Sequence, residues 1–220
     1  MTAPYERIGA TRIRTADETA ESRRRVRGFW FHCDYARGTP VAKYLAKRGL
    51  PWLAGHASIR YRAETSHPSG AFLPAMIALI YDGAGAISAV HRTYLTSDGY
   101  KASVDPVKAS LGSFAGGAIR LDPAGPEMVI GEGLETAASA GFVLGLPAWA
   151  AVACGNLRSS MVLPPTVKTV VIAADHDGPG RRAAHGAAAR WKAEGRAVRI
   201  ATPDRTGADF NDLLRERLHA

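Results

Sequence analysis

Residues 126–220 alternate between apolar runs and helical stretches, and this alternation limits the possible folds more than any other feature of the chain. Four strand-length runs are each followed, after a short connection, by a helical pattern. Such alternation predicts a parallel sheet with right-handed crossovers. A breaker cluster, Asp-Pro-Ala-Gly-Pro at 122–126, marks the start of this domain. The expected strands are 127–131, 148–153, 167–174 and 197–201, and the expected helices are 134–144, 156–161, 179–194 and 210–218.

Acidic residues of this domain follow the first and third expected strands. Glu132 ends the first strand, with Glu135 one helical turn later, and Asp175 and Asp177 follow the third. In a sheet of order 2-1-3-4 these strands are neighbours, and open α/β sheets bind ligands at the carboxyl ends of their strands. Clustered carboxylates repel one another unless a cation lies between them, and hard oxygen ligands suit Mg²⁺ or Mn²⁺.

Each acidic pair also has a simpler interpretation. Glu132 and Glu135 suit the start of any helix, where the helix dipole favours negative charge. Asp175 and Asp177 suit a strand-to-helix turn with a capping Asp. Because both pairs lie at strand ends expected to be adjacent, we favour a metal site for phosphoryl chemistry.

The preceding half has a different pattern, typical of a mixed α+β unit at residues 38–125. Thr39 and Pro40 are expected to open a helix that Gly49 ends. Two apolar runs, 75–81 and 86–95, flank the turn residues 82–85 and predict a β-hairpin. Residues 1–37 are polar and basic and are expected to form an N-terminal arm.

Positive charge is concentrated in the first half. Residues 1–125 hold 17 Lys and Arg against 10 Asp and Glu, whereas residues 126–220 hold 11 against 10. A basic half suits binding to a phosphate backbone, although a solvated basic surface would have the same composition. The candidate residues for nucleic-acid or nucleotide phosphates are Arg92, Lys101, Lys108, Arg181 and Arg182.

Other features exclude several classes of protein. No run of about 18 apolar residues is present, so no membrane span is expected. The polar start does not resemble a signal peptide, which predicts a cytoplasmic protein. Cys33 and Cys154 are far apart and lie outside any metal-binding spacing, so a disulfide framework or zinc site is not expected.

Two motifs of the second half resemble those of Toprim domains. VIGEGLETA at 129–137 resembles the Toprim glutamate motif, and ADHDGPG at 174–180 resembles its DxD motif. The resemblance implies a Rossmann-like α/β fold, in which a four-stranded parallel sheet is flanked by helices. It also implies that Glu132 is the principal acid and that Asp175 and Asp177 are metal ligands. Glu135 occupies the place of a second acid.

The end of the chain and the first half resemble primases in particular. TGADFNDLL at 206–214 is similar to the ending of primase Toprim domains, which implies a further metal-side acid at Asp209. YLAKRGL at 44–50 and the stretch 73–92 resemble the polymerase core of primases from bacteria, phages and plasmids. Neither a zinc ribbon nor a helicase-binding domain is recognised. Either a separate zinc-binding module and a replicative helicase are partners, or the chain is a shortened relative of primases.

We therefore expect an Mg²⁺-dependent or Mn²⁺-dependent nucleotidyltransferase of DNA-primase type, from a phage or other mobile element. It would make short primers on a single-stranded DNA template from nucleoside triphosphates. One alternative is a Toprim nuclease that uses the same metals with water as nucleophile. The other is a non-catalytic nucleic-acid-binding accessory protein that descends from a primase.

Overall fold

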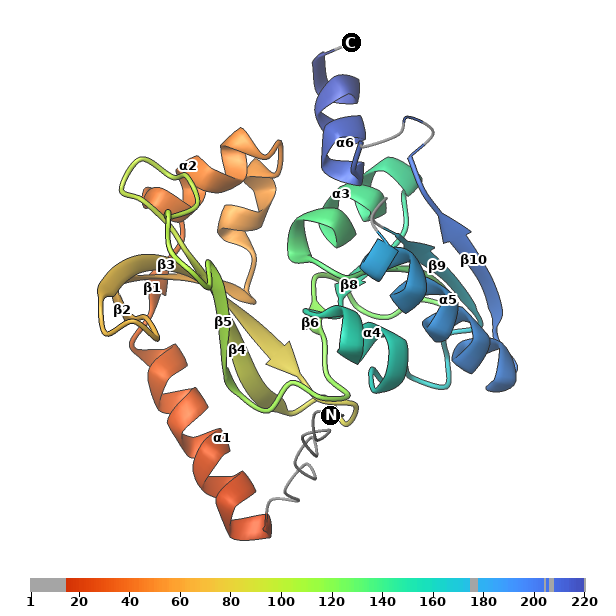
Figure 1. The fold of residues 1–220 in the computed structure, drawn as a ribbon, viewed down its shortest axis with the longest axis horizontal. Coiled ribbons are helices and arrows are strands. Elements are labelled where there is room, and N and C mark those ends of the chain that lie inside the picture. Colours follow the sequence, from red (N-terminus) through yellow and green to blue (C-terminus); the bar gives the residue numbers. More distant parts are fainter. Residues whose placement is uncertain (1–14, 175–177, 204, 206–207, 220) are drawn as a thin grey trace, which may run out of the picture.

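A computed structural model describes residues 15–174, 178–203, 205 and 208–219. These residues form two five-stranded sheets, one from each half of the chain, with helices around them (Figure 1). A bridge between Tyr81 and Ala118 links the two sheets. None of the described helices is long and apolar enough to cross a membrane.

The N-terminal sheet is an antiparallel meander in the order β1-β2-β3-β4-β5. The expected hairpin is confirmed as β3 and β4, and the Asp82 carboxylate organises its turn by accepting hydrogen bonds from the N–H groups of Ala84 and Ala86. Its strands are β1 (Asp34–Tyr35), β2 (Ile59–Ser66), β3 (Phe72–Tyr81), β4 (Ile87–Tyr94) and β5 (Lys108–Gly112).

The two faces of this sheet pack against different partners. Helix α1 (Ala16–Phe31) covers the outer face, where its Val26 and Trp30 pack among Ile77 and Val90. The inner face, which includes Ile80, packs toward the C-terminal half. Much of the expected N-terminal arm is therefore a helix docked on the sheet, held by two apolar residues within an arginine-rich stretch.

The expected helix after Thr39 is confirmed as α2 (Pro40–Lys47). Thr39 caps it by accepting a hydrogen bond from the Val41 N–H at 3.2 Å, and Pro40 occupies the first turn. Gly49 follows with a φ of 70°, a conformation that glycine adopts without strain. The short 3-10 helix η1 (Pro51–Gly55) then leads into β2.

The C-terminal sheet has the order β10-β9-β7-β8-β6. The four parallel strands confirm the expected order 2-1-3-4, and a short antiparallel strand from before the breaker cluster extends one edge. Its strands are β6 (Ile119–Arg120), β7 (Glu127–Gly131), β8 (Ala148–Ala150), β9 (Thr169–Ala173) and β10 (Ala197–Ala201).

Helices cover both faces of the C-terminal sheet. On one face, α4 (Cys154–Ser159) and α5 (Gly178–Ala193) enclose a core that contains Trp149 and Trp191. On the other face lie α3 (Leu134–Leu144) and α6 (Phe210–His219). Because α3 also packs on the inner face of the N-terminal sheet, one continuous core joins the two halves.

Candidate metal and nucleic-acid site

Glu132 lies at the carboxyl edge of the C-terminal sheet, directly after β7. Gly131, the last residue of β7, pairs with Ala173, the last residue of β9. Glu132 and Ala174 therefore leave two adjacent strands at the same edge, as the acidic-cluster hypothesis requires. The other two predicted ligands, Asp175 and Asp177, lie outside the described residues.

The backbone around Glu132 is tightly organised. A Cβ atom at Gly131 would lie 2.7 Å from the Ala137 nitrogen, so only glycine lets α3 approach β7 this closely. The Glu132 carbonyl accepts a hydrogen bond from the Val152 N–H at 2.8 Å, and Val152 has a φ of 77°. A β-branched residue in this conformation is strained, and strained backbone is more frequent at functional sites than elsewhere.

A cysteine thiol contacts the Glu132 carboxylate. Cys154 Sγ donates to Glu132 Oε2 at 2.7 Å, from the first residue of α4. Sequence reasoning missed this contact, because the two residues are 22 positions apart and the cysteine belongs to no motif. The thiol therefore fixes one oxygen of the Glu132 carboxylate at the end of β7.

Glu135 occupies a different environment from Glu132. It is buried, accepts a hydrogen bond from the Tyr44 hydroxyl and forms an ion pair with Lys108 at 3.3 Å. Burial by itself would raise the pKa of Glu135, but Lys108, Lys101 and the Tyr44 hydroxyl lower it to about 2. Glu135 therefore joins α3 to α2 and β5, and its metal role stays a prediction.

Asp209 also has local partners. Its Oδ1 accepts a hydrogen bond from the Asp212 N–H at 2.8 Å, and its own N–H donates to Asp212 Oδ2 at 3.2 Å. This reciprocal pair is a capping box at the start of α6. Asn211 beside it donates to the carbonyl of Arg48 and to Ser139 Oγ. The Asp-x-Asn-Asp motif thus fastens α6 to α2 and α3, and the proposed metal role of Asp209 remains untested.

The predicted basic residues do not form one group. Lys108 pairs with Thr93 in the sheet and faces Glu135, and Lys101 also lies close enough to act on that carboxylate. Arg92 pairs with Ile77, whose side chain belongs to the outer core under α1. The Arg92 guanidinium donates a hydrogen bond to the Ser66 carbonyl at 3.0 Å. Arg92 is therefore on the opposite face of the sheet from Lys108.

Arg181 and Arg182 occupy the first turn of α5, and both are exposed. This helix begins directly after the segment that contains Asp175 and Asp177. Neither arginine forms an ion pair with an acidic side chain of the described residues. Their predicted phosphate-binding role is compatible with this position.

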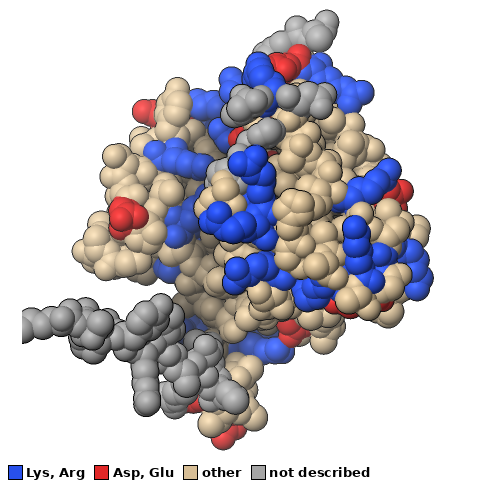
Figure 2. Space-filling view, turned by 45° about the vertical axis from the view of Figure 1, so that its right-hand side comes forward, with Lys and Arg blue, Asp and Glu red and all other residues tan. Residues whose placement is uncertain are grey.

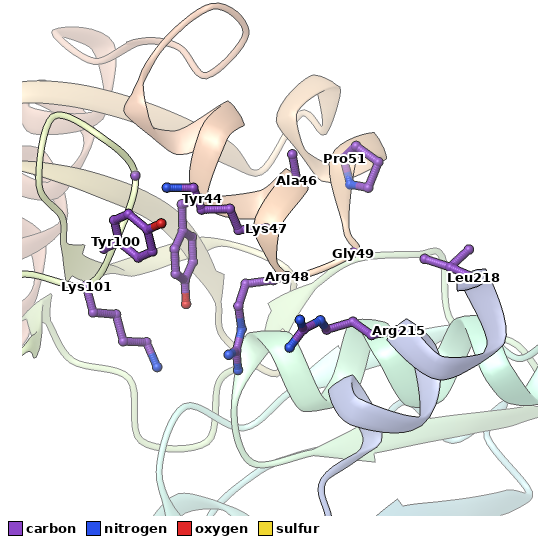
Figure 3. A pocket seen from close by; sticks show the side chains of 11 residues that line it. Tyr44, Ala46, Lys47, Arg48, Gly49, Pro51, Tyr100, Lys101, Arg215 and Leu218 are labelled. Atoms are coloured by element: carbon purple, nitrogen blue, oxygen red, sulfur yellow. The ribbon is translucent and has the colours of Figure 1, made fainter. Parts of the chain in front are cut away.

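A pocket of about 770 Å³ opens between α2, the turn at residues 96–101 and α6 (Figure 3). None of its described lining residues is acidic, and the charged ends of Lys101, Arg48 and Arg215 project toward one another beside the Tyr44 hydroxyl. Sequence reasoning missed Arg48, although it lies four residues after Tyr44, on the same side of α2. The pocket's basic and aromatic lining residues are Tyr44, Lys47, Arg48, Tyr100, Lys101 and Arg215.

The sequence matches two family models. Residues 127–220 match the Toprim domain, which covers the sheet edge with Glu132 and the helices around it. The C-terminal half of this chain is a Toprim domain. Residues 20–121, from α1 through the N-terminal sheet, match a domain of unknown function, DUF7146. No curated protein matches the chain.

Solved structures resemble nearly the whole chain, beyond the Toprim domain alone. A DNA primase domain from Pseudomonas aeruginosa has a TM-score of 0.59 at 15% identity, covering 89% of this chain and 74% of its own. The primase fragment of the bacteriophage T7 primase-helicase has a TM-score of 0.55 at 14% identity, with coverages of 84% and 76%. The RNA polymerase domain of Mycobacterium tuberculosis primase DnaG, in complex with double-stranded DNA, has a TM-score of 0.54 at 14% identity, with coverages of 92% and 80%. The fold is that of a primase catalytic core.

Basic side chains lie on both sides of the recess between the Toprim domain and the N-terminal sheet (Figure 2). Few acidic side chains are visible on this face. Among the described residues, no three His, Cys, Asp or Glu side chains gather closely enough to hold a metal ion. Glu132 fits a magnesium site by its oxygen chemistry and its strand-end position, and a complete site would need ligands from the segment with Asp175 and Asp177.

His91 makes the folding stability of the protein depend on pH. Burial, assisted by the charge of Lys108, lowers the pKa of His91 to about 4, from an ordinary value near 6.5. In the unfolded chain His91 therefore binds a proton as the pH falls below about 6.5. In the folded protein its imidazole stays neutral until about pH 4. Folding stability should fall across this interval by about 3 kcal/mol.

Replacement of His91 by glutamine should remove this contribution and retain a partner for Ser110, whose hydroxyl lies 3.2 Å from the imidazole. Urea unfolding at pH 7, 5.5 and 4.5 checks the prediction. The stability difference between wild type and His91→Gln should change in favour of the variant as the pH falls. A constant difference would show that His91 titrates equally in the folded and unfolded states.

Proposed function

We propose that this protein is a primase-type nucleotidyltransferase that extends short primers on single-stranded DNA. The observation that carries the proposal is the position of Glu132 at the carboxyl edge of a Toprim sheet, within a chain that has the fold of a primase catalytic core. Glu132 leaves the edge of the Toprim sheet beside the end of β9. Lys108 and Lys101 lie close to Glu135, in the first turn of the helix that follows. An acidic residue for a metal and basic side chains for phosphate thus lie around the start of one helix.

In the proposed reaction, the 3′-oxygen of the primer bonds to the α-phosphorus of a nucleoside triphosphate. The bond from this phosphorus to pyrophosphate breaks, and the hydroxyl gives up its proton. Mg²⁺ or Mn²⁺, when bound, supplies positive charge that favours the ionised hydroxyl and the leaving pyrophosphate. Glu132 is proposed as the principal acid at this position, and Asp175 and Asp177 are proposed as further ligands.

The pocket beside the recess suits the triphosphate. Arg48 Nε is buried and has no hydrogen-bond partner within the described part of the chain. The end of its side chain projects into the pocket (Figure 3), and the terminal N–H groups of a guanidinium suit a phosphate group. Arg48, Lys101 and Arg215 converge in the pocket, and Tyr100 beside them is largely exposed (Figure 3). We assign the triphosphate of the nucleotide to these cations, and the template strand to the basic recess.

One assay tests the proposed function and its alternatives together. The purified protein is incubated with single-stranded DNA, labelled nucleotides and either Mg²⁺ or Mn²⁺, and product lengths are read on a gel. The proposal expects a ladder of products longer than the labelled nucleotide. Shortening of the DNA would favour a nuclease. Binding without any product, across ribonucleotides and deoxyribonucleotides, would favour a non-catalytic accessory protein.

A further inference from the structure

The outer face of the N-terminal sheet carries a second group of cations and rings, separate from the recess. Helix α1 and this face lie on the side of the sheet away from the Toprim domain (Figure 1). At the end of α1, the arginines of β2 stack on aromatic rings. The Arg60 guanidinium lies 4.4 Å from the ring centre of Tyr35 and 5.1 Å from that of Trp30. Arg62 lies 5.1 Å from the ring centre of Phe29.

The backbone fixes both guanidinium groups in place. Arg60 donates to the Cys33 carbonyl at 3.2 Å, and Arg62 donates to the His32 carbonyl at 2.9 Å. Within the described part of the chain, neither arginine forms an ion pair with an acidic side chain. Their positive charges are therefore positioned but not neutralised, and each guanidinium keeps further N–H donors.

Two large rings of the same region, one on β1 and one at the end of α1, are open to solvent. Tyr35 is 76% exposed and Phe31 is 77% exposed, although a folded protein usually covers most of such a ring. Tyr35 lies in β1, the short edge strand, and Phe31 ends α1 directly before the carbonyl that holds Arg62. Exposed rings next to fixed guanidinium groups are the combination that binds single-stranded nucleic acid, in which bases stack and phosphates pair with cations.

We infer that Phe31, Tyr35, Arg60 and Arg62 form a platform for single-stranded nucleic acid, distinct from the proposed catalytic recess. The unpaired bases of a single strand can reach Tyr35 and Phe31, whereas the stacked bases of a duplex cannot. The phosphates lie against Arg60 and Arg62. This platform lets the protein hold a strand on the far side of the sheet without metal or nucleotides.

The test measures binding of a labelled oligothymidylate in EDTA, without nucleotides, by fluorescence anisotropy at several salt concentrations. Each platform variant is made in wild type and in a Lys101→Gln background, which removes one of the cations proposed to bind phosphates beside the recess. Phe31→Ala with Tyr35→Ala should weaken binding about 5-fold to more than 100-fold, the effect of losing base stacking. Because the protein keeps its charge, the dependence of affinity on salt should keep its slope.

The arginines should behave in the opposite way. Arg60→Gln with Arg62→Gln should lower the slope of log affinity against log salt by about 0.7 for each phosphate that no longer has a cation beside it. Matched controls are Phe142→Ala, an exposed ring on α3, and Arg217→Gln, an exposed arginine on α6 that also binds a backbone carbonyl. Both controls should bind the oligonucleotide as wild type does.

A base-level readout completes the design. An oligonucleotide containing 2-aminopurine should lose fluorescence on binding to wild type, through ring stacking, and keep it with the Tyr35→Ala variant. The melting temperature should not change in the ring variants, since both rings are exposed, so weaker binding cannot be attributed to unfolding. Unchanged affinity of the ring variants in both backgrounds, or equal weakening for single-stranded and duplex DNA, would overturn the platform. A negative primer assay would not change the outcome of this binding test, because the platform binds DNA without catalysis.

Discussion

Nucleotide addition should fall by orders of magnitude when Glu132 is replaced by glutamine, while the protein remains folded. Glutamine keeps the size of the side chain and an oxygen that can accept the Cys154 hydrogen bond. It removes the anionic oxygen that Mg²⁺ requires. Primer extension with labelled nucleotides measures the loss, and thermal unfolding together with DNA binding shows that the remaining structure is intact.

The matched control is Glu127→Gln, at the other end of the same strand. Glu127 pairs with Arg199 near the surface, so the same change of charge there should leave activity near the wild-type level. Asp175→Asn, in the segment outside the described residues, should match the activity loss of Glu132→Gln if both acids hold one metal. Full activity of Glu132→Gln would remove the metal site from this edge of the sheet.

The C-terminal sheet could be predicted from the sequence because it depends on patterns of neighbouring residues. Apolar runs of strand length and short connections define parallel strands, and the order 2-1-3-4 placed Glu132 at the switch point. The expected helix at 134–144 has the bounds of α3, which Gly133 and Gly145 flank in the structure. The position of Glu132 could thus be predicted from patterns a few residues long.

Features that depend on contacts between residues far apart in the sequence could not be predicted in this way. Arg92 and Lys108 both lie on strands, but only the register of β4 and β5 shows that they face opposite sides of the sheet. One partner of Glu135 is Tyr44, which lies 91 residues earlier in the chain. Helix α1 docks through Val26 and Trp30, and a sequence dominated by arginine gives little sign of this packing.

Loss of the Glu135 side chain should destabilise the protein by about 3–5 kcal/mol, the usual effect of removing one partner of a buried ion pair. Glu135→Ala leaves the Tyr44 hydroxyl buried without its acceptor and Lys108 without its counter-ion. Urea unfolding at pH 7 measures the change. Tyr44→Phe, which removes only the hydroxyl, should cost about 2 kcal/mol, because the lost hydrogen bond is to a charged group. Glu194→Ala, which removes an exposed acid paired with Arg190, should cost less than about 1 kcal/mol.

The pH dependence gives this prediction a second measurement. The folded-state pKa of Glu135 is about 2, below its ordinary value, so its stabilising contribution is complete above about pH 4.5 and is lost as the pH falls toward 2. The stability difference between wild type and Glu135→Ala should therefore be constant from pH 7 to about 5 and shrink only in stronger acid. If Glu135 were instead one of several repelling metal ligands, its removal would leave the metal-free protein equally stable or more stable. The sign of the change at pH 7, without metal, thus distinguishes a residue that joins the two halves of the molecule from a residue that holds the ion.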